Sequence, residues 1–538
     1  MPRMAFELPR RTKRRPMSKN QRRAGATLQQ KVHLREGSAI HLPKSRGISW
    51  QCNYTAAVSF YSLLVLDRSQ SAVLIFVSPE IYNDKERHER GDSMSHPLDL
   101  ASMINREPLR AFQWAIFLLC FATTLFDGFD TQAIAYTGPA IVEAFGLKAG
   151  DLAPILIAGR LGMTIGAMTL GLVGDRIGRR PALLGGVLLF SVASLLTAFA
   201  TGTGQILVLR FIAGLGMGGC TPVLLALAAE YGPARHRGAI MTGVLLGLPA
   251  GAMLGGLLAA RMMPAIGWQG VFVVGGAAPL ALFVVLYFVL PESLQYLVSR
   301  QRSTSAKQVH AILRRLLSAA PPSDVSFRVH ETATRASVGA LFRQGNARNT
   351  IAIWAVYFFN WIAWFMFLSW LPTVLKASGL PVEQAPMGTV VVNAVFILCA
   401  IPLSILLPKI SARRLLIVLL TIGIVIAIGL ANSGTAWNLV FVLTGAAGLG
   451  IGGQQIVLNY LVVGAYPTSL RATATGWAIG MGRVGAIVGS AIGGTFLGMG
   501  GPNSFYLALA VPLLAALLAV LTIRTSQQAV DPDLAVAH

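Results

Sequence analysis

Long runs of apolar residues, separated by short polar segments, follow one another from about residue 112 to residue 523. A helix of about 20 apolar residues spans the hydrocarbon core of a bilayer. Each run is long enough for one such helix, and the polar segments supply the turns between them. The pattern predicts an all-α membrane protein with twelve transmembrane helices, over residues 112–138, 152–173, 182–200, 205–228, 238–260, 270–290, 349–371, 384–407, 414–431, 437–459, 473–497 and 503–523.

The composition supports this prediction. Hydrophobic residues make up 54% of the chain and charged residues only 12%, whereas a soluble domain carries about 25% charged residues. Lipid must therefore cover most of the outer surface. Cys52, Cys120, Cys220 and Cys399 lie far apart and show no spacing typical of disulfides or metal sites, so we expect no metal ion.

Positive charges are distributed unevenly over the predicted loops. The loops after even-numbered spans contain most of the arginines and lysines, and the loops after odd-numbered spans contain few. Because positive loops stay in the cytoplasm, we expect the even-numbered loops and both termini on the cytoplasmic side. This topology accounts for the net charge of +22 without a nucleic-acid partner.

Residues 1–93 differ from the rest of the chain. They contain 17 Lys and Arg against 8 Asp and Glu, and they show no lasting periodicity. Their apolar stretch, 56–77, is broken by Asp67 and Arg68, which are costly inside a membrane. Such a basic leader can be a targeting peptide or an arm that binds nucleic acid. We favour a disordered leader that follows from a start codon assigned too early, with Met94 as the true start.

A glycine motif recurs at a fixed distance. Gly214–Gly219 reads GLGMGG and Gly448–Gly453 reads GLGIGG, an offset of 234 residues, and Arg237 and Arg471 lie at the same offset. A shared motif in a shared register predicts two six-helix bundles related as parallel repeats. We expect the bundles at 94–290 and 349–523, a cytoplasmic linker at 291–348 and a cytoplasmic tail at 524–538.

The loop after the second span reads Gly171-Leu-Val-Gly-Asp175-Arg176-Ile-Gly178-Arg179-Arg180-Pro181. It resembles the signature loop of the major facilitator superfamily. The resemblance implies the major facilitator fold and a latch of charged residues at helix ends, which favours one packing of the bundles. We expect this latch to include Asp175, Arg176, Arg179, Glu230, Arg237 and Arg471.

The first span contains a second motif, Leu125-Phe126-Asp127-Gly128-Phe129-Asp130-Thr131. It resembles the motif of the aromatic acid:H+ symporter family, which includes benzoate and 4-hydroxybenzoate transporters. The similarity to this family extends from about Pro97 to the end of the twelfth span. It implies proton-coupled uptake of a small aromatic carboxylate, such as benzoate, 4-hydroxybenzoate or protocatechuate, by alternating access around a site near the membrane midplane.

Asp127 and Asp130 are three residues apart, so they project from one face of the predicted helix. A charge at the membrane centre costs roughly 2.5–3.5 kcal/mol on insertion scales. Two such acids require a wet cavity or a proton, and a carboxylate of this kind can take up a proton outside and release it inside. We expect proton coupling at this pair, and the division of roles between the two stays open because coupled acids titrate as a unit.

Three arginines inside predicted spans are candidates for binding a substrate carboxylate: Arg160, Arg210 and Arg483. Arg210 could instead pair with Asp127 or Asp130, and Arg483 has glycine neighbours that suit a structural role. Arg160 departs from the family pattern, in which an apolar or small residue is usual. It either binds the substrate or acts as the counter-ion of an acid in the first span.

Aromatic and amide side chains of the seventh and tenth spans could recognise the rest of an aromatic acid. The seventh span is rich in aromatic residues, which offer flat apolar walls. A bare amide in lipid is costly, so buried amides are candidates for recognising a hydroxyl or carboxylate. We expect substrate contacts from Asn360, Trp364, Gln455 and Asn459.

Two other functions stay open beside an aromatic acid transporter. One is an importer of another organic anion, and the other is a non-transporting sensor of aromatic acids on the same fold. No pattern of a nucleophile with a base indicates an enzyme. We expect a monomer in the inner membrane of a bacterium, with no cofactor and the proton as coupling ion.

Overall fold

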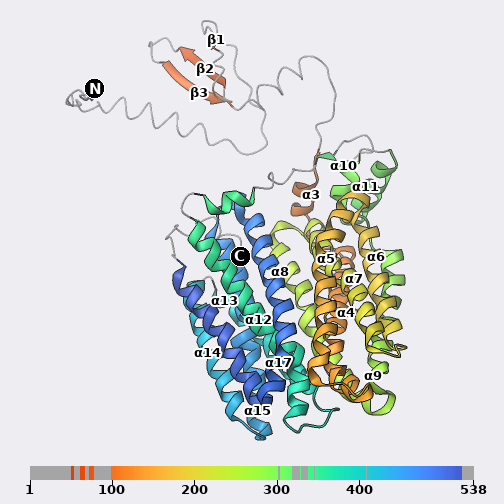
Figure 1. Ribbon diagram of the computed structural model, residues 1–538. Helices are drawn as coiled ribbons and strands as arrows, with labels where there is room; N and C mark the ends of the chain where they lie inside the picture. The colour runs from red at the N-terminus through yellow and green to blue at the C-terminus, as the bar shows by residue number, and fades with distance from the viewer. Residues whose placement is uncertain are drawn as a thin grey trace, which may run out of the picture. The chain divides into compact units, whose positions relative to one another are not determined.

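The computed structural model describes residues 50–53, 61–66, 72–77, 98–300, 303–317, 327–328, 337–343, 346–407 and 409–523. The chain divides into two compact units, Met1–Met94 and Ser95–His538. The described part of the first unit is an antiparallel sheet (Figure 1) with the strand order β1 (Trp50–Asn53), β2 (Tyr61–Leu66) and β3 (Ala72–Val77).

These strands were not predicted from the sequence. β2 and β3 occupy most of the apolar stretch 56–77, and Asp67 and Arg68 separate them in the sequence. The two charged residues that disfavour a membrane span therefore come between two strands that pair with each other. The remaining residues of the leader lie outside the described residues, so its disorder and the start at Met94 stay predictions.

The first bundle of the second unit is built from long apolar helices. In chain order these are α4 (Ala111–Ala144), the short η1 (Ala149–Leu152), α5 (Ala153–Ile177), α6 (Arg179–Thr197), α7 (Thr203–Tyr231), α8 (Ala234–Leu245) and α9 (Gly247–Val289).

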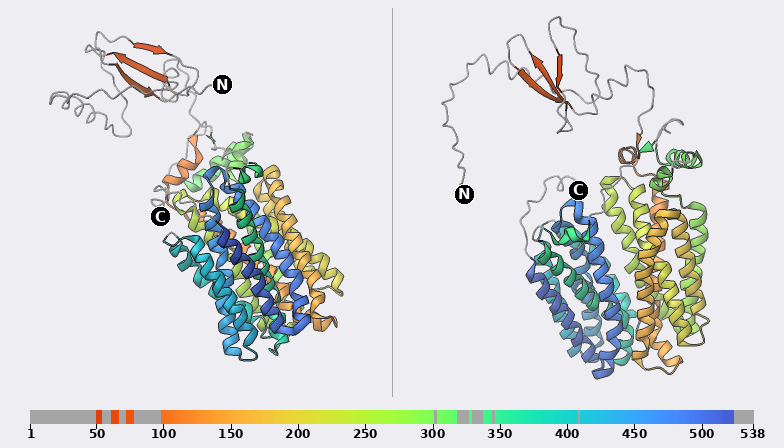
Figure 2. Two further views of the ribbon diagram at one scale, coloured as in Figure 1. Left: turned by 60° about the vertical axis from the view of Figure 1, so that its left-hand side comes forward. Right: turned by 45° about the horizontal axis from the view of Figure 1, so that its top comes forward.

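The second bundle follows the same plan. It contains α12 (Ala347–Ala377), α13 (Met387–Leu406), α14 (Ala412–Asn432), α15 (Trp437–Ala447), the π-helical turn η3 (Gly448–Gly452), α16 (Gln454–Ala465) and α17 (Thr468–Thr522). Figure 2 shows the two bundles side by side, with their helices roughly parallel.

Two of the helical runs are too long for one crossing. α8 and α9 form an apolar run of 56 residues, which at about 1.5 Å per residue is more than twice the ~30 Å of the hydrocarbon core. Gly267 breaks this run with a φ of 67°, and Gly501 breaks α17 with the same φ. Glycine adopts this left-handed conformation without steric cost, so each run makes two spans.

The number of spans agrees with the sequence. The described residues contain 10 helical runs that are long and apolar enough to cross a membrane. Two of these runs are the broken ones, and each contributes two crossings. The described residues therefore contain twelve spans, and the predicted fold class is confirmed.

Short elements lie between and before the bundles. The region 291–348 contains α10 (Leu294–Ser299), α11 (Ser303–Leu316), β5 (Phe327–Arg328) and η2 (Val338–Phe342). Before α4 lie β4 (Leu98–Asp99), which pairs in parallel with β5, and α3 (Leu100–Arg106). The predicted tail, 524–538, falls outside the described residues.

The repeated glycines have the same role in both bundles. A Cβ atom at Gly214 or Gly218 of α7 would collide with the backbone of α5 at Gly159 or Met163. A Cβ atom at Gly448 would collide with the backbone of the corresponding helix α13. Small residues thus let the second and fourth spans of each bundle approach closely. The bundles differ at one point, since the second copy of the motif forms the π-helical turn η3.

The two bundles contact each other at the end of the helices opposite α10 and α11, which we call the far end. There Gly256 of α9 lies against Val390 of α13, and the ammonium Nζ of Lys376 lies 2.8 Å from the carboxylate Oε2 of Glu143. Elsewhere α5 packs on α17 and α4 packs on α12. The end that carries α10 and α11 is called the linker end below.

Candidate functional site

The two acids of the first span are buried in the middle of α4. Asp127 and Asp130 are each 1% exposed. Gly128 between them lies against the backbone of Leu248 in α9, where any side chain would collide. This close approach holds α4 against α9 and directs both carboxylates away from that contact, toward other helices.

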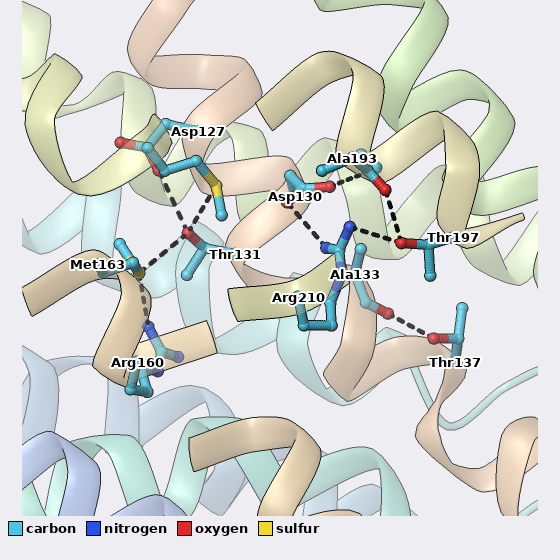
Figure 3. A network of polar contacts seen from close by, with 12 residues as sticks. Asp127, Asp130, Thr131, Ala133, Thr137, Arg160, Met163, Ala193, Thr197 and Arg210 are labelled. Carbon is cyan, nitrogen blue, oxygen red and sulfur yellow. Dashed lines mark hydrogen bonds and ion pairs between the residues drawn. The ribbon is translucent and has the colours of Figure 1, made fainter. Parts of the chain in front are cut away.

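Asp130 is engaged in an ion pair (Figure 3). Its Oδ2 lies 2.9 Å from Nη1 of Arg210 in α7, and its Oδ1 accepts a hydrogen bond from the hydroxyl of Ser194 in α6. Arg210 also donates from Nη2 to Oγ1 of Thr197 at 3.1 Å and lies over the ring of Phe272. Of the alternatives for Arg210, the structure shows pairing with Asp130.

Asp127 has a different environment. Its Oδ2 accepts a hydrogen bond of 2.9 Å from Thr221, and its Oδ1 accepts one of 3.3 Å from Thr131. In the part of the chain that the structure describes, no ion pair includes Asp127. Two acids three residues apart therefore differ in kind, one compensated by a cation and one held by hydroxyls.

Two arginines approach Met163 from opposite bundles. Arg160 of α5 is 8% exposed, its guanidinium carbon lies 4.4 Å from the ring centre of Phe365 in α12, and its Nη1 lies 3.8 Å from Sδ of Met163. Arg483 of α17 donates from Nη1 to the carbonyl oxygen of Met163 at 2.9 Å. Neither arginine forms an ion pair within the described residues.

A pocket connects Asp130 and Arg210 with Arg160. It lies beside the Asp130–Arg210 pair and reaches Arg160. Two cations, a carboxylate, a hydroxyl and two methionine sulfurs line it together with apolar side chains. The lining residues are Asp130, Thr131, Ile134, Ile155, Leu156, Gly159, Arg160, Met163, Arg210 and Met217.

Four amides of α12 and α16 form two separate groups. Asn360 donates to Gln454 and both side chains are buried. Gln455 and Asn459 instead form a chain of hydrogen bonds with Trp361 and Tyr357. Trp364 packs within this bundle, against Gly452 and the ring of Phe396.

The predicted latch residues lie at the linker end. Arg179 forms an ion pair with Glu230, and the carboxylate of Glu292 accepts hydrogen bonds from the backbone N–H groups of Arg179 and Arg180 at 2.9 and 3.0 Å. Gly178 starts this turn with a φ of 113° and lies directly against the Glu292 carboxylate. These contacts join helices of the first bundle.

Three of the other latch candidates are exposed, and one lies in the second bundle. Asp175, Arg176 and Arg237 are exposed, and the backbone oxygen of Arg176 accepts a hydrogen bond from Arg300. Arg471 lies in the second bundle, where its Nε donates to the carbonyl oxygen of Tyr466 at 3.1 Å. A latch function of the whole set stays a prediction.

Several residues of the site were not predicted from the sequence. Ser194, Thr197 and Thr221 supply hydroxyls to the buried charges, but single hydroxyl residues are common in apolar helices and give no signal. Thr131 could have been found, because it lies four residues after Asp127 on the same helical face. In the described residues no group of three or more His, Cys, Asp or Glu could hold a metal ion.

Comparison with known proteins gives the family. The model of the Major Facilitator Superfamily matches residues 120–436 and 353–535. A gallate transporter of Pseudomonas putida is 36% identical over 428 residues, which are 79% of this chain and 95% of that protein. The 4-hydroxybenzoate transporter PcaK of the same species is 35% identical over 416 residues, 76% of this chain and 92% of that protein.

A solved structure supports the fold alone. The crystal structure of a D-xylose-proton symporter superposes with a TM-score of 0.61 at 17% sequence identity, over 77% of this chain and 97% of that chain. The two Pseudomonas putida relatives are named as transporters and not as enzymes. With twelve spans in two repeated bundles, the chain therefore belongs to the major facilitator superfamily of membrane transporters.

Proposed function

We propose that the protein takes up a small aromatic carboxylate together with protons, by alternating access of a site between the two bundles. The observation that carries the proposal is Arg160. A buried cation is costly unless an anion compensates it. Arg160 forms no ion pair within the described residues: its guanidinium contacts a methionine sulfur and a phenyl ring, and Asp127 attracts it without forming an ion pair. A substrate carboxylate would supply an anion in direct contact with this guanidinium.

The surroundings of Arg160 suit an aromatic acid better than an aliphatic one. Phe365 of the opposite bundle lies under the guanidinium, and Trp361 lies 5.3 Å from Phe365 between ring centres. Aromatic rings stack on such walls with a gain beyond their buried area. The relatives named as gallate and 4-hydroxybenzoate transporters support the same substrate class.

Arg483 offers a second positive group. It approaches Met163 from the second bundle, whereas Arg160 approaches from the first. A carboxylate held between the two arginines would contact both bundles at once. Binding would then favour a state in which the bundles are close, as alternating access requires.

The two acids have distinct roles in this proposal. Asp130 pairs with Arg210, so we assign it the structural role of holding α4 against α7. Asp127 accepts hydrogen bonds from two hydroxyls and forms no ion pair within the described residues, and a proton there would remove a buried charge. We therefore propose Asp127 as the group that takes up the coupling proton, with no other cofactor.

The membrane topology is part of the proposal. The linker end carries the positive residues of the loops after even-numbered spans, such as Arg176, Arg179 and Arg180. Positive loops stay on the cytoplasmic side, so we place the linker end and both termini in the cytoplasm of a bacterium. The far end would then face outward, and one chain would suffice for transport.

Uptake in membrane vesicles tests the proposal. Labelled benzoate, 4-hydroxybenzoate and protocatechuate are supplied with and without a protonophore, and succinate serves as the aliphatic control. We expect accumulation of at least one ring acid, collapse with the protonophore and no uptake of succinate. Uptake that is unchanged by the protonophore would exclude proton coupling. Uptake of succinate alone would favour an importer of another organic anion.

A further inference from the structure

A chain of hydrogen bonds in the second bundle begins at an indole group. Nε1 of Trp361 lies 2.5 Å from the side chain of Gln455, and an indole N–H can only donate. The atom of Gln455 that faces it must therefore be the oxygen Oε1. This contact determines how the remaining amides are oriented.

The orientation passes along α16 from Gln455 to Asn459. With its oxygen bound to the indole, Gln455 presents Nε2, a donor, to Asn459 at 3.2 Å. The atom of Asn459 in this contact must therefore be its oxygen Oδ1. The hydroxyl of Tyr357 donates to the same oxygen at 2.8 Å. The amide nitrogen Nδ2 of Asn459, with its two N–H donors, is left at the end of the chain.

The amide of Asn459 is accessible, whereas the side chains that it bonds are partly or fully buried. Asn459 is exposed, while Tyr357 is fully buried and Trp361 and Gln455 are half-buried. An amide donor turned toward lipid hydrocarbon would be costly, so its open side suits a polar space. The first residue of this series of hydrogen bonds lies near the proposed carboxylate site, because Trp361 contacts Phe365 and Phe365 contacts Arg160.

We propose that Nδ2 of Asn459 donates a hydrogen bond to an acceptor atom on the ring of the substrate, on the side remote from the carboxylate. The inference rests on the proposed function and adds a specificity to it. A benzene ring holds a carboxylate and a para substituent on opposite sides, so a carboxylate at Arg160 directs the substituent along the Phe365–Trp361 wall. Aromatic acids with an oxygen acceptor at that position are then preferred over those with a donor.

The polarity of this contact can be tested with a pair of ring acids. 4-Methoxybenzoate carries an acceptor without a donor, and 4-aminobenzoate carries N–H donors and a poor acceptor. Both are measured as competitors of labelled 4-hydroxybenzoate in vesicles, with benzoate as the unsubstituted reference. One hydrogen bond gives a preference of about three- to tenfold, so we expect 4-methoxybenzoate to compete better than 4-aminobenzoate by that factor.

Asn459→Asp changes the outward atom with little change of shape. One carboxylate oxygen still accepts from Tyr357 and Gln455, and the other now faces the substrate as an acceptor. The added charge weakens all carboxylate substrates alike, so the ratio of the two competitors is the readout. We expect the preference to invert in favour of 4-aminobenzoate. In Asn459→Leu no side-chain hydrogen bond to the substrate ring is left, so the ratio of the two competitors should lose the contribution of that bond.

Asn432→Asp is the matched control, because this exposed asparagine at the end of α14 bonds only its own helix within the described residues. It should keep the wild-type ratio. An unchanged ratio in Asn459→Asp, or in Asn459→Leu where the aspartate variant does not reach the membrane, overturns the inference. If wild-type protein takes up no ring acid at all, the proposed function fails instead, and the two failures are distinguishable.

Discussion

Replacing Asp130 by asparagine removes one partner of a fully buried ion pair. The side chains of Arg210 and Asp130 are 3% and 0% exposed, and their charged atoms lie 2.9 Å apart. Removing one partner of such a pair costs about 3–5 kcal/mol, because the other charge is left buried without compensation. The hydroxyl of Thr197 and the ring of Phe272 remain near Arg210, but neither carries a negative charge.

Asp127→Asn is the matched comparison on the same helix. Within the described residues its carboxylate accepts hydrogen bonds from two hydroxyls and forms no ion pair, and an asparagine oxygen can still accept one of these hydrogen bonds. The loss of stability should then be about 1 kcal/mol, the net value of one hydrogen bond. The two variants carry the same chemical change three residues apart, so the difference between them reports the ion pair.

The assay is denaturant unfolding of the purified protein in detergent, followed by tryptophan fluorescence. We expect Asp130→Asn to lower the free energy of unfolding by at least about 2 kcal/mol more than Asp127→Asn does. Adding Arg210→Met to Asp130→Asn should recover part of the loss, since no lone charge remains. Equal losses of stability in the two single variants, or a double variant less stable than both, would refute the assigned pairing.

Three further predictions concern other parts of the molecule. Arg160→Met should raise the KM for aromatic acid uptake about tenfold to a hundredfold at normal protein levels, as expected for the loss of one charge-assisted hydrogen bond; an unchanged KM would remove this residue from the site. Gly178→Ala should lower stability by about 1–3 kcal/mol, because alanine is strained at a φ of 113°, whereas Gly185→Ala in open surroundings should not. Reversing either Glu143 or Lys376 alone should open the far end to a membrane-impermeant thiol reagent at an introduced cysteine, and reversing both should close it again; equal labelling in all three would contradict the role of this ion pair.

The sequence was informative where a property depends on a continuous run of residues. The spans follow from apolar length, and even the two fused runs could be divided, because the polar or glycine-rich segments near Gly267 and Gly501 interrupt the hydrophobic pattern. The glycine repeat also gave the relation between the bundles, since close packing of helices requires small residues at both copies. The strands in the leader were missed, because short apolar segments give a weak signal.

Partners across the fold were harder to predict. Arg210 could have paired with either acid, and only the arrangement of α4, α6 and α7 brings it to Asp130 together with Ser194. Met163 gave no signal, although arginines of both bundles reach it. The ion pair of Glu143 with Lys376 joins residues 233 positions apart in the chain.

The sequence by itself determined that this is a membrane protein with twelve spans in two related bundles, because burial in lipid is decided by the length and polarity of each segment alone. It also identified Asp127 and Asp130 as unusual, since any charge within such a segment is costly. Only the tertiary structure decided that Asp130 forms an ion pair with Arg210, whereas Asp127 forms none within the described residues. The reason is geometric: a side chain inside the bundle meets atoms of other helices, and their register depends on packing that no single segment encodes.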